Sequence, residues 1–210
     1  MEFIYNGKKL ELLDGDIDGI YYNIERYKNT GNIREAYIKP TEIKTPVGKF
    51  DIDRIYLYEN GKLLGVRFKM TEFINTPVGR LEFKEIFFYE SGKIHFGRFV
   101  KRQTIKIQGQ KKEVTSFPVY LYETGELKKC CIYNPIEVVT KIGKLKIYGD
   151  VGFYKNGKIK FGQSYGNFVK GIKIEELVKL NFDEDGNLIL KFKKQKNKRR
   201  IKWIKILMTI

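Results

Sequence analysis

Residue types that catalytic and metal centres need are scarce in this sequence. The 210 residues include one histidine, His95, and two adjacent cysteines, Cys130 and Cys131. No cysteine and histidine cluster has the spacing of a zinc site, and a catalytic triad would have only His95 to draw on. Adjacent strand residues face opposite ways, so we expect one cysteine inward, one outward and no disulfide framework. These absences predict a cytoplasmic, non-enzymatic protein without cofactors.

Long apolar segments are missing too. No stretch approaches the ~18 apolar residues that cross a membrane, and residues 1–8 lack the apolar core of a signal peptide. The 20 glycines are spread along the chain and do not form a phosphate-binding loop. The carboxylate pairs Asp51–Asp53 and Asp183–Asp185 are expected to face solvent, although hydrolysis by carboxylates alone stays an alternative. We therefore predict no membrane span and no catalytic residues.

What the sequence does contain is a glycine turn that recurs six times. The turn glycines are 30, 31, 33, 32 and 29 residues apart, and they are Gly31, Gly61, Gly92, Gly125, Gly157 and Gly186. A period of this length indicates stacked copies of one supersecondary unit. In the first and last turns the aromatic residue, Tyr27 or Phe182, lies four positions before the glycine. We interpret this extra residue as the variation expected of terminal units.

Short apolar runs precede the turns and favour β-strands. Aromatic and β-branched residues dominate them, as in Ile55–Tyr58 and Ile86–Tyr89. We expect these aromatic side chains to pack in the core. The turn glycine supplies the positive φ that a tight hairpin or a G1 bulge requires.

A second turn motif lies between the glycine turns. Thr45-Pro-Val-Gly48 matches Thr76-Pro-Val-Gly79, and we expect each to lead into a third strand. The predicted fold is all-β, an elongated tandem array of about six three-stranded antiparallel units. This array fills residues 1–190 as a single domain.

The C-terminal segment, residues 191–210, is strongly basic. It holds nine cations and no acidic residue, in a chain whose formal net charge is +16. Such a segment attracts nucleic-acid phosphates or an anionic membrane surface, and a tryptophan can stack on a base. The predicted polyanion-binding residues are Lys193, Lys194, Lys196, Lys198, Arg199, Arg200, Lys202 and Trp203. The alternatives are a solvated extension, a last strand pair that caps the array, or a composition that reflects codon bias.

Residues 14–25 match the ligand spacing of a calcium-binding EF-hand loop. Asp14, Asp16 and Asp18 occupy the first ligand positions, and Glu25 occupies the bidentate position. No helix is expected before the segment, and it aligns with the strand residues 48–56. We therefore expect an acidic strand and turn, with a calcium site as the alternative.

The turn from Tyr58 to Leu63, Tyr-Glu-Asn-Gly-Lys-Leu, resembles the motif of MORN-type β-hairpin repeats, including the YwqK-like antitoxin group. The match covers the hairpin in five or six units. This chain departs from the family in its longer period and its additional Thr-Pro-Val-Gly turn. The resemblance implies a non-enzymatic module that binds protein or lipid head groups through the exposed faces of an extended sheet. It carries over no functional residues.

Two functions are consistent with these observations. The leading prediction is an interaction scaffold that binds another macromolecule, a protein above all, through its extended sheet face. The alternative is a nucleic-acid- or ribonucleoprotein-binding protein, such as an inhibitor of a nucleic-acid enzyme, that acts through the basic segment. Open sheet edges also favour self-association.

Overall fold

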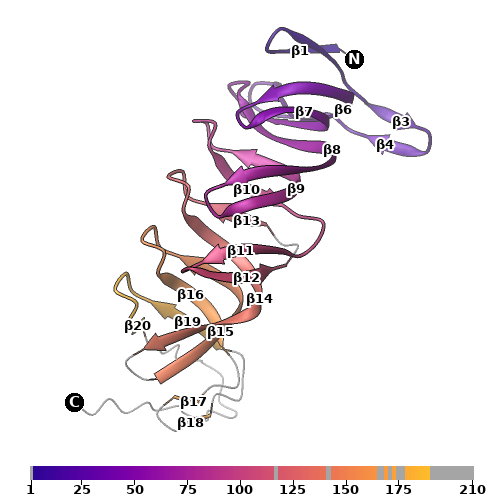
Figure 1. The fold of residues 1–210 in the computed structure, drawn as a ribbon. Coiled ribbons are helices and arrows are strands. Elements are labelled where there is room, and N and C mark those ends of the chain that lie inside the picture. The colour runs from indigo at the N-terminus through magenta and orange to yellow at the C-terminus, as the bar shows by residue number, and fades with distance from the viewer. Residues whose placement is uncertain are drawn as a thin grey trace, which may run out of the picture.

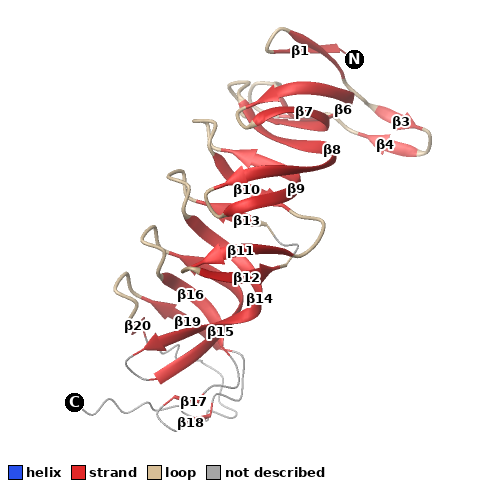
Figure 2. Cartoon of the chain, viewed as in Figure 1, coloured by secondary structure: helices blue, strands red, loops and turns tan. Residues whose placement is uncertain are grey.

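The computed structural model describes residues 2–115, 118–140, 143–164, 168–169, 172–173 and 178–189. Every regular element in these ranges is a β-strand, so the all-β prediction is confirmed. Figure 1 shows an elongated molecule in which the strands follow one another along its length. Figure 2 shows that a row of turns lines one side of it.

Most strands belong to one large antiparallel sheet. Each strand in the following order pairs with the next: β5 (Glu25–Arg26), β6 (Ile33–Thr45), β7 (Gly48–Leu57), β8 (Leu63–Thr76), β9 (Gly79–Phe88), β10 (Ile94–Arg98), β13 (Val119–Leu121), β14 (Leu127–Thr140), β15 (Gly143–Phe153), β16 (Ile159–Ser164), β19 (Val178–Phe182) and β20 (Leu188–Ile189). The hairpin of β11 (Gln103–Ile107) and β12 (Gln110–Val114) joins the same sheet, because β12 also pairs with β14. Three separate hairpins are β1 (Glu2–Tyr5) with β2 (Lys8–Glu11), β3 (Gly15–Ile17) with β4 (Ile20–Tyr22), and β17 (Phe168–Val169) with β18 (Ile172–Lys173).

The strand count between turns differs from the expectation of three per unit. Two strands, β8 and β9, lie between Gly61 and Gly92, and the turn at residues 76–79 joins them. β8 is long, and its pairing with β9 shifts register between Arg67 and Glu72. Its first half also pairs with β7, whereas its second half pairs with β9 alone. β8 therefore continues as one strand through a bend between Arg67 and Glu72. The periodicity of the sequence does not reveal that the two halves are one strand.

The glycine turns share one hydrogen-bond pattern. The Gly61 amide donates to the Tyr58 carbonyl at 2.9 Å, and the Tyr58 amide donates to the Lys62 carbonyl at 2.8 Å. Gly61 has a φ of 80°, the positive value of a type I turn with a G1 bulge. The first turn has one residue more, since the Gly31 amide bonds to Tyr27, four positions earlier.

The last turn corrects the expectation for Phe182. The Gly186 amide donates to the Asp183 carbonyl at 3.0 Å, so this turn has the ordinary length. Asp183 occupies the position that tyrosine holds elsewhere, and its carboxylate accepts hydrogen bonds from the amides of Asp185 and Asn187. Phe182 is a strand residue before the turn, where it is buried.

Tyrosine hydroxyl groups connect each turn to the next. Five of them donate to a backbone carbonyl at 2.7–3.0 Å, in the pairs Tyr27 to Leu57, Tyr58 to Phe88, Tyr89 to Leu121, Tyr122 to Phe153 and Tyr154 to Phe182. Each accepting residue immediately precedes the following turn. The spacing of the turns is therefore held by side chains as well as by the backbone ladder.

A second set of hairpins folds over one face of the sheet. We call the hairpins of residues 41–52, 72–83 and 103–114 the arms. Their tips reach glycine turns further along the chain: Pro46 lies beside Gly92 and Pro77 beside Gly125. The side-chain amide of Gln108, in the third arm, donates to the Gly157 carbonyl at 3.2 Å. Each arm thus covers strands that come later in the sequence.

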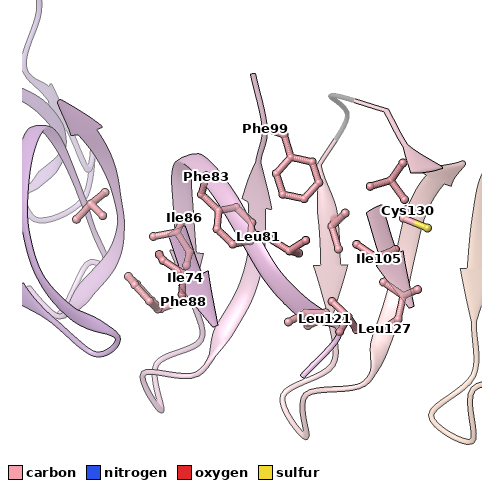
Figure 3. Close-up of a cluster of buried hydrophobic side chains, with 14 of the residues drawn as sticks. Ile74, Leu81, Phe83, Ile86, Phe88, Phe99, Ile105, Leu121, Leu127 and Cys130 are labelled. Atoms are coloured by element: carbon pink, nitrogen blue, oxygen red, sulfur yellow. The ribbon is translucent and has the colours of Figure 1, made fainter. Parts of the chain in front are cut away.

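The hydrophobic core lies between the sheet and the arms. Phe50 on the first arm contacts Phe68 of the sheet, and Phe83 on the second arm contacts Phe99, each at 5.1 Å between ring centres. Figure 3 shows Phe83, Phe99 and Cys130 in this cluster. Burial raises the pKa of the Cys130 thiol to about 12, whereas Cys131 is only half-buried. Strand alternation therefore separates the two cysteines as predicted.

The acidic segment near the N-terminus forms the β3–β4 hairpin. Asp18 and Gly19 take positive φ values of 53° and 76° at its tip, and the Gly19 amide donates to Asp16 Oδ1 at 3.0 Å. Glu25, the expected bidentate ligand, forms an ion pair with Arg34. A hairpin with this geometry takes the place of a calcium loop. Within the described residues, no three or more metal-binding side chains are grouped to hold an ion.

The predictions of a basic C-terminal segment and of no membrane span remain to be compared with the structure. The basic segment 191–210, with all of its predicted polyanion-binding residues, lies outside the described residues. In the described part of the chain, no helix has the length and apolar character needed to cross a membrane.

Replacing Tyr89 by phenylalanine tests the hydroxyl connections between turns. We expect Tyr89→Phe to lower the free energy of unfolding by about 0.5–1.5 kcal/mol, the usual net contribution of one hydrogen bond. The ring still packs, so only the bond to Leu121 is lost. Urea denaturation followed by circular dichroism measures the change, with Tyr21→Phe as the control because Tyr21 is exposed. Equal losses in the two variants would contradict the role of the hydroxyl group.

Candidate binding face

The sheet face opposite the core lacks a covering layer. The arms all lie on the core side, and from β7 to β13 no described strand packs over the other side. Residues two apart on a strand share this open face, as Arg54 and Tyr56 do on β7 and Glu85 and Phe87 do on β9. The strand register arranges these side chains in two rows that cross the sheet.

Aromatic rings form the first row. The register pairs Tyr56 with Gly65, Gly65 with Phe87, Phe87 with Phe96, and Phe96 with Tyr120. Successive ring centres are 4.7, 4.3 and 5.1 Å apart, and Phe87 stacks flat on Phe96. Tyr56 reaches Phe87 across β8 because Gly65 has no side chain: a Cβ there would lie 2.6 Å from Phe87 Cδ1. We call these four rings the aromatic row.

Tyr56 and Phe87 are buried, as expected of their apolar runs, but they do not belong to the core cluster between the sheet and the arms. The two side chains are only 7% and 8% exposed because the rings cover one another, and they face away from the core cluster. Phe96 and Tyr120 are half-buried. A run of four apolar residues does not reveal which members face outward. The available signal was the charged residue two positions before Tyr56 and Phe87, on the same side of each strand.

One tyrosine and four charged residues form the second row. Its members are consecutive cross-strand neighbours: Tyr37, Arg54, Arg67, Glu85 and Arg98. The guanidinium groups of Arg54 and Arg67 lie 4.2 and 4.8 Å from the centre of the Tyr37 ring, which are cation–π distances. Both guanidinium groups are thus positioned by contact with the Tyr37 ring.

The arginines of the second row are balanced by carboxylates. The ion pairs are Arg54 with Glu35, Arg67 with Asp53 at 2.7 Å, and Arg98 with Glu85 at 3.2 Å. Asp53, expected to face solvent, is therefore a half-buried partner of Arg67, while Asp51 is exposed. A face whose charges cancel in this way attracts polyanions less than an unpaired basic patch does.

A groove of about 460 Å³ lies on this face. Three rings of the aromatic row and three arginines line it: Tyr56, Phe87, Phe96, Arg34, Arg54 and Arg98. The Arg54 Nε is buried and has no hydrogen-bond acceptor among the described residues. The groove combines apolar surface with guanidinium donors, which suits a ligand that carries an apolar group beside an oxygen acceptor.

Two titratable groups of the face have shifted pKa values. Burial, together with the charge of Glu85, raises the pKa of Tyr56 well above its ordinary value. Its hydroxyl stays protonated and donates to Glu85 Oε1 at 3.1 Å. Burial and then the charge of Lys128 lower the pKa of His95, whose ring lies 4.4 Å from that of Tyr89. Both groups are neutral at pH 7 and serve packing and hydrogen bonding.

Toward the C-terminus the same side of the sheet becomes more basic. Lysine ammonium groups lie over aromatic rings at 4.8–5.6 Å, in the pairs Lys128 with Tyr122, Lys160 with Tyr154 and Lys179 with Phe161. These lysines are exposed. Proteins that bind single-stranded nucleic acids combine such cations, which contact phosphates, with aromatic rings, on which bases stack.

Neither a protein-family model nor a curated protein sequence matches this chain. The geometry of the open face is therefore the basis for assigning a function.

Replacing Gly65 by alanine tests how the aromatic row is built. The added methyl group would meet the Phe87 ring and lie 2.8 Å from the Ile86 carbonyl oxygen. We expect Gly65→Ala to lower the free energy of unfolding by about 1–3 kcal/mol, as overpacking does. In Gly65→Ala/Phe87→Ala the combined loss should be smaller than the sum of the single losses, because the two sites touch. Strictly additive losses in urea denaturation would show that the ring does not occupy this space.

Proposed function

We propose that this protein is a non-catalytic binding module that holds another protein on its open sheet face. The aromatic row is the central contact, and the paired arginines surround it. One observation carries the proposal: four rings are lined up on a face that the chain's own arms leave uncovered. Protein interfaces are enriched in tyrosine, phenylalanine and arginine, and their energetic centres are clusters of such residues.

The charge distribution favours a protein over a nucleic acid as the partner of the aromatic row. The three arginines of the second row each have a carboxylate partner. Counterion release, which drives binding to phosphates, needs cations that are available to the phosphates. The extended main sheet and the resemblance to MORN-type hairpins support the same class of function.

Nucleic-acid binding is the second candidate, and a separate set of residues favours it. The exposed lysines beside Tyr122, Tyr154 and Phe161 lie toward the C-terminal end of the sheet. The nine cations of residues 191–210 follow in the sequence. A partner held there would be released by salt, because each phosphate contact displaces counterions.

Truncating two rings of the aromatic row tests the proposal. We expect Phe96→Ala/Tyr120→Ala to raise the Kd for the captured protein by about 30-fold or more. This is the effect of losing residues that contribute at least ~2 kcal/mol to the binding free energy. Tagged wild type and variant are used to purify partners from the native host, with nuclease present, and the Kd is measured with the purified partner. Phe73→Ala is the matched control, since Phe73 is an exposed aromatic residue on an arm.

Two outcomes would count against a protein partner on this face. Capture that survives in the Phe96→Ala/Tyr120→Ala variant, with unchanged circular dichroism, would place the binding site elsewhere. Capture that is lost on nuclease treatment, on raising the salt concentration and on removing residues 191–210 would favour the nucleic-acid candidate.

A further inference from the structure

The β3–β4 hairpin stands apart from the main sheet. Its two strands pair only with each other, and Figure 1 shows them projecting from the N-terminal end of the array. An isolated two-stranded hairpin is marginally stable in water unless its apolar side packs on something. Three large apolar side chains near its tip are nevertheless exposed: Ile17 by 38%, Ile20 by 56% and Tyr21 by 76%.

The hairpin is also the acidic part of a basic protein. Residues 10–25 contain five carboxylates and no lysine or arginine, although the chain carries a formal net charge of +16. Asp14, Asp16 and Asp18 are all exposed. The hairpin therefore presents apolar side chains and negative charge together.

The groove on the open face offers apolar surface and guanidinium donors, and Glu35 also lies in its lining. Its rings offer apolar contact, and the side chains of Arg34 and Arg98 are each more than half exposed. Each of these arginines forms an ion pair with one carboxylate, and a guanidinium group has further donors for a second acceptor. The exposure of Ile20 and Tyr21 shows that the chain's own hairpin does not fill its own groove.

The hairpin and the groove lie near the same end of the molecule. Tyr22, at the base of the hairpin, contacts Tyr37 with ring centres 5.2 Å apart, and Tyr37 also carries the guanidinium groups of Arg54 and Arg67. A two-fold axis at this end of the molecule would bring the hairpin of each copy toward the groove of the other. Such an interface is closed and uses the same two surfaces twice.

We propose that the groove binds the β3–β4 hairpin of a second copy of this chain, forming a symmetric dimer. The second copy's Tyr21 and Ile20 pack on the aromatic row, and its aspartates face Arg34 and Arg98. The inference rests on the proposed role of the open face as a binding surface.

Sedimentation velocity of the purified full chain over a wide concentration range tests this dimer. We expect a reversible monomer–dimer equilibrium whose Kd rises at least tenfold in Tyr21→Asp and at least tenfold in Arg98→Glu. Met70→Asp is the control, because Met70 is an exposed apolar residue on β8, outside the groove. A mixture of Tyr21→Asp with Arg98→Glu should dimerise more tightly than either variant alone, since one intact hairpin then meets one intact groove.

The outcomes separate this inference from the proposed function. A wild-type chain that stays monomeric, or a dimer whose Kd neither substitution changes, overturns the hairpin exchange. If partner capture still depends on Phe96 and Tyr120 in that case, the binding face stands and only its occupant was wrong. If capture is independent of both residues as well, the proposed function fails with it.

Discussion

A single β-sheet has two faces, and this chain buries only one of them. The arms fold back over the sheet and enclose the core, in which Phe83 and Phe88 are almost fully buried. The properties of the candidate binding face follow from this difference between the two faces. Because no second layer covers the opposite face, its aromatic residues can be shielded only by one another and by the charged side chains beside them.

The arms and the tyrosine hydroxyl groups connect different parts of the array. Each hydroxyl group joins one turn to the strand that leads into the next, as from Tyr58 to Phe88. Each arm reaches further, since Pro46 passes the adjacent turn at Gly61 and also lies beside Gly92. The two kinds of contact overlap, so they connect successive strands along the molecule beneath the open face.

Local signals in the sequence predicted the local structure. Gly61 and Gly92 were recognised as turn residues because a positive φ is costly for other residues, and the strands beside them follow from aromatic and β-branched content. The turns at two arm tips, Thr45–Gly48 and Thr76–Gly79, were predicted. The folding of the arms over the sheet was not, because a bend within a continuous strand such as β8 leaves no periodic mark. Tyr56 and Phe87 are buried as expected, but alternation in an all-apolar run does not identify the side of the sheet on which they lie. Of the candidate site, only its residue types were apparent.

One face of the sheet is covered by the arms, and the other is open. Hydroxyl-radical footprinting of the native chain, read by mass spectrometry and normalised to the unfolded protein, measures this difference most directly. Tyr120 and His95 on the open face should be modified much faster than Phe88 and Phe153 beneath the arms. Equal protection of the two pairs, or faster modification of Phe88 and Phe153, would contradict the account.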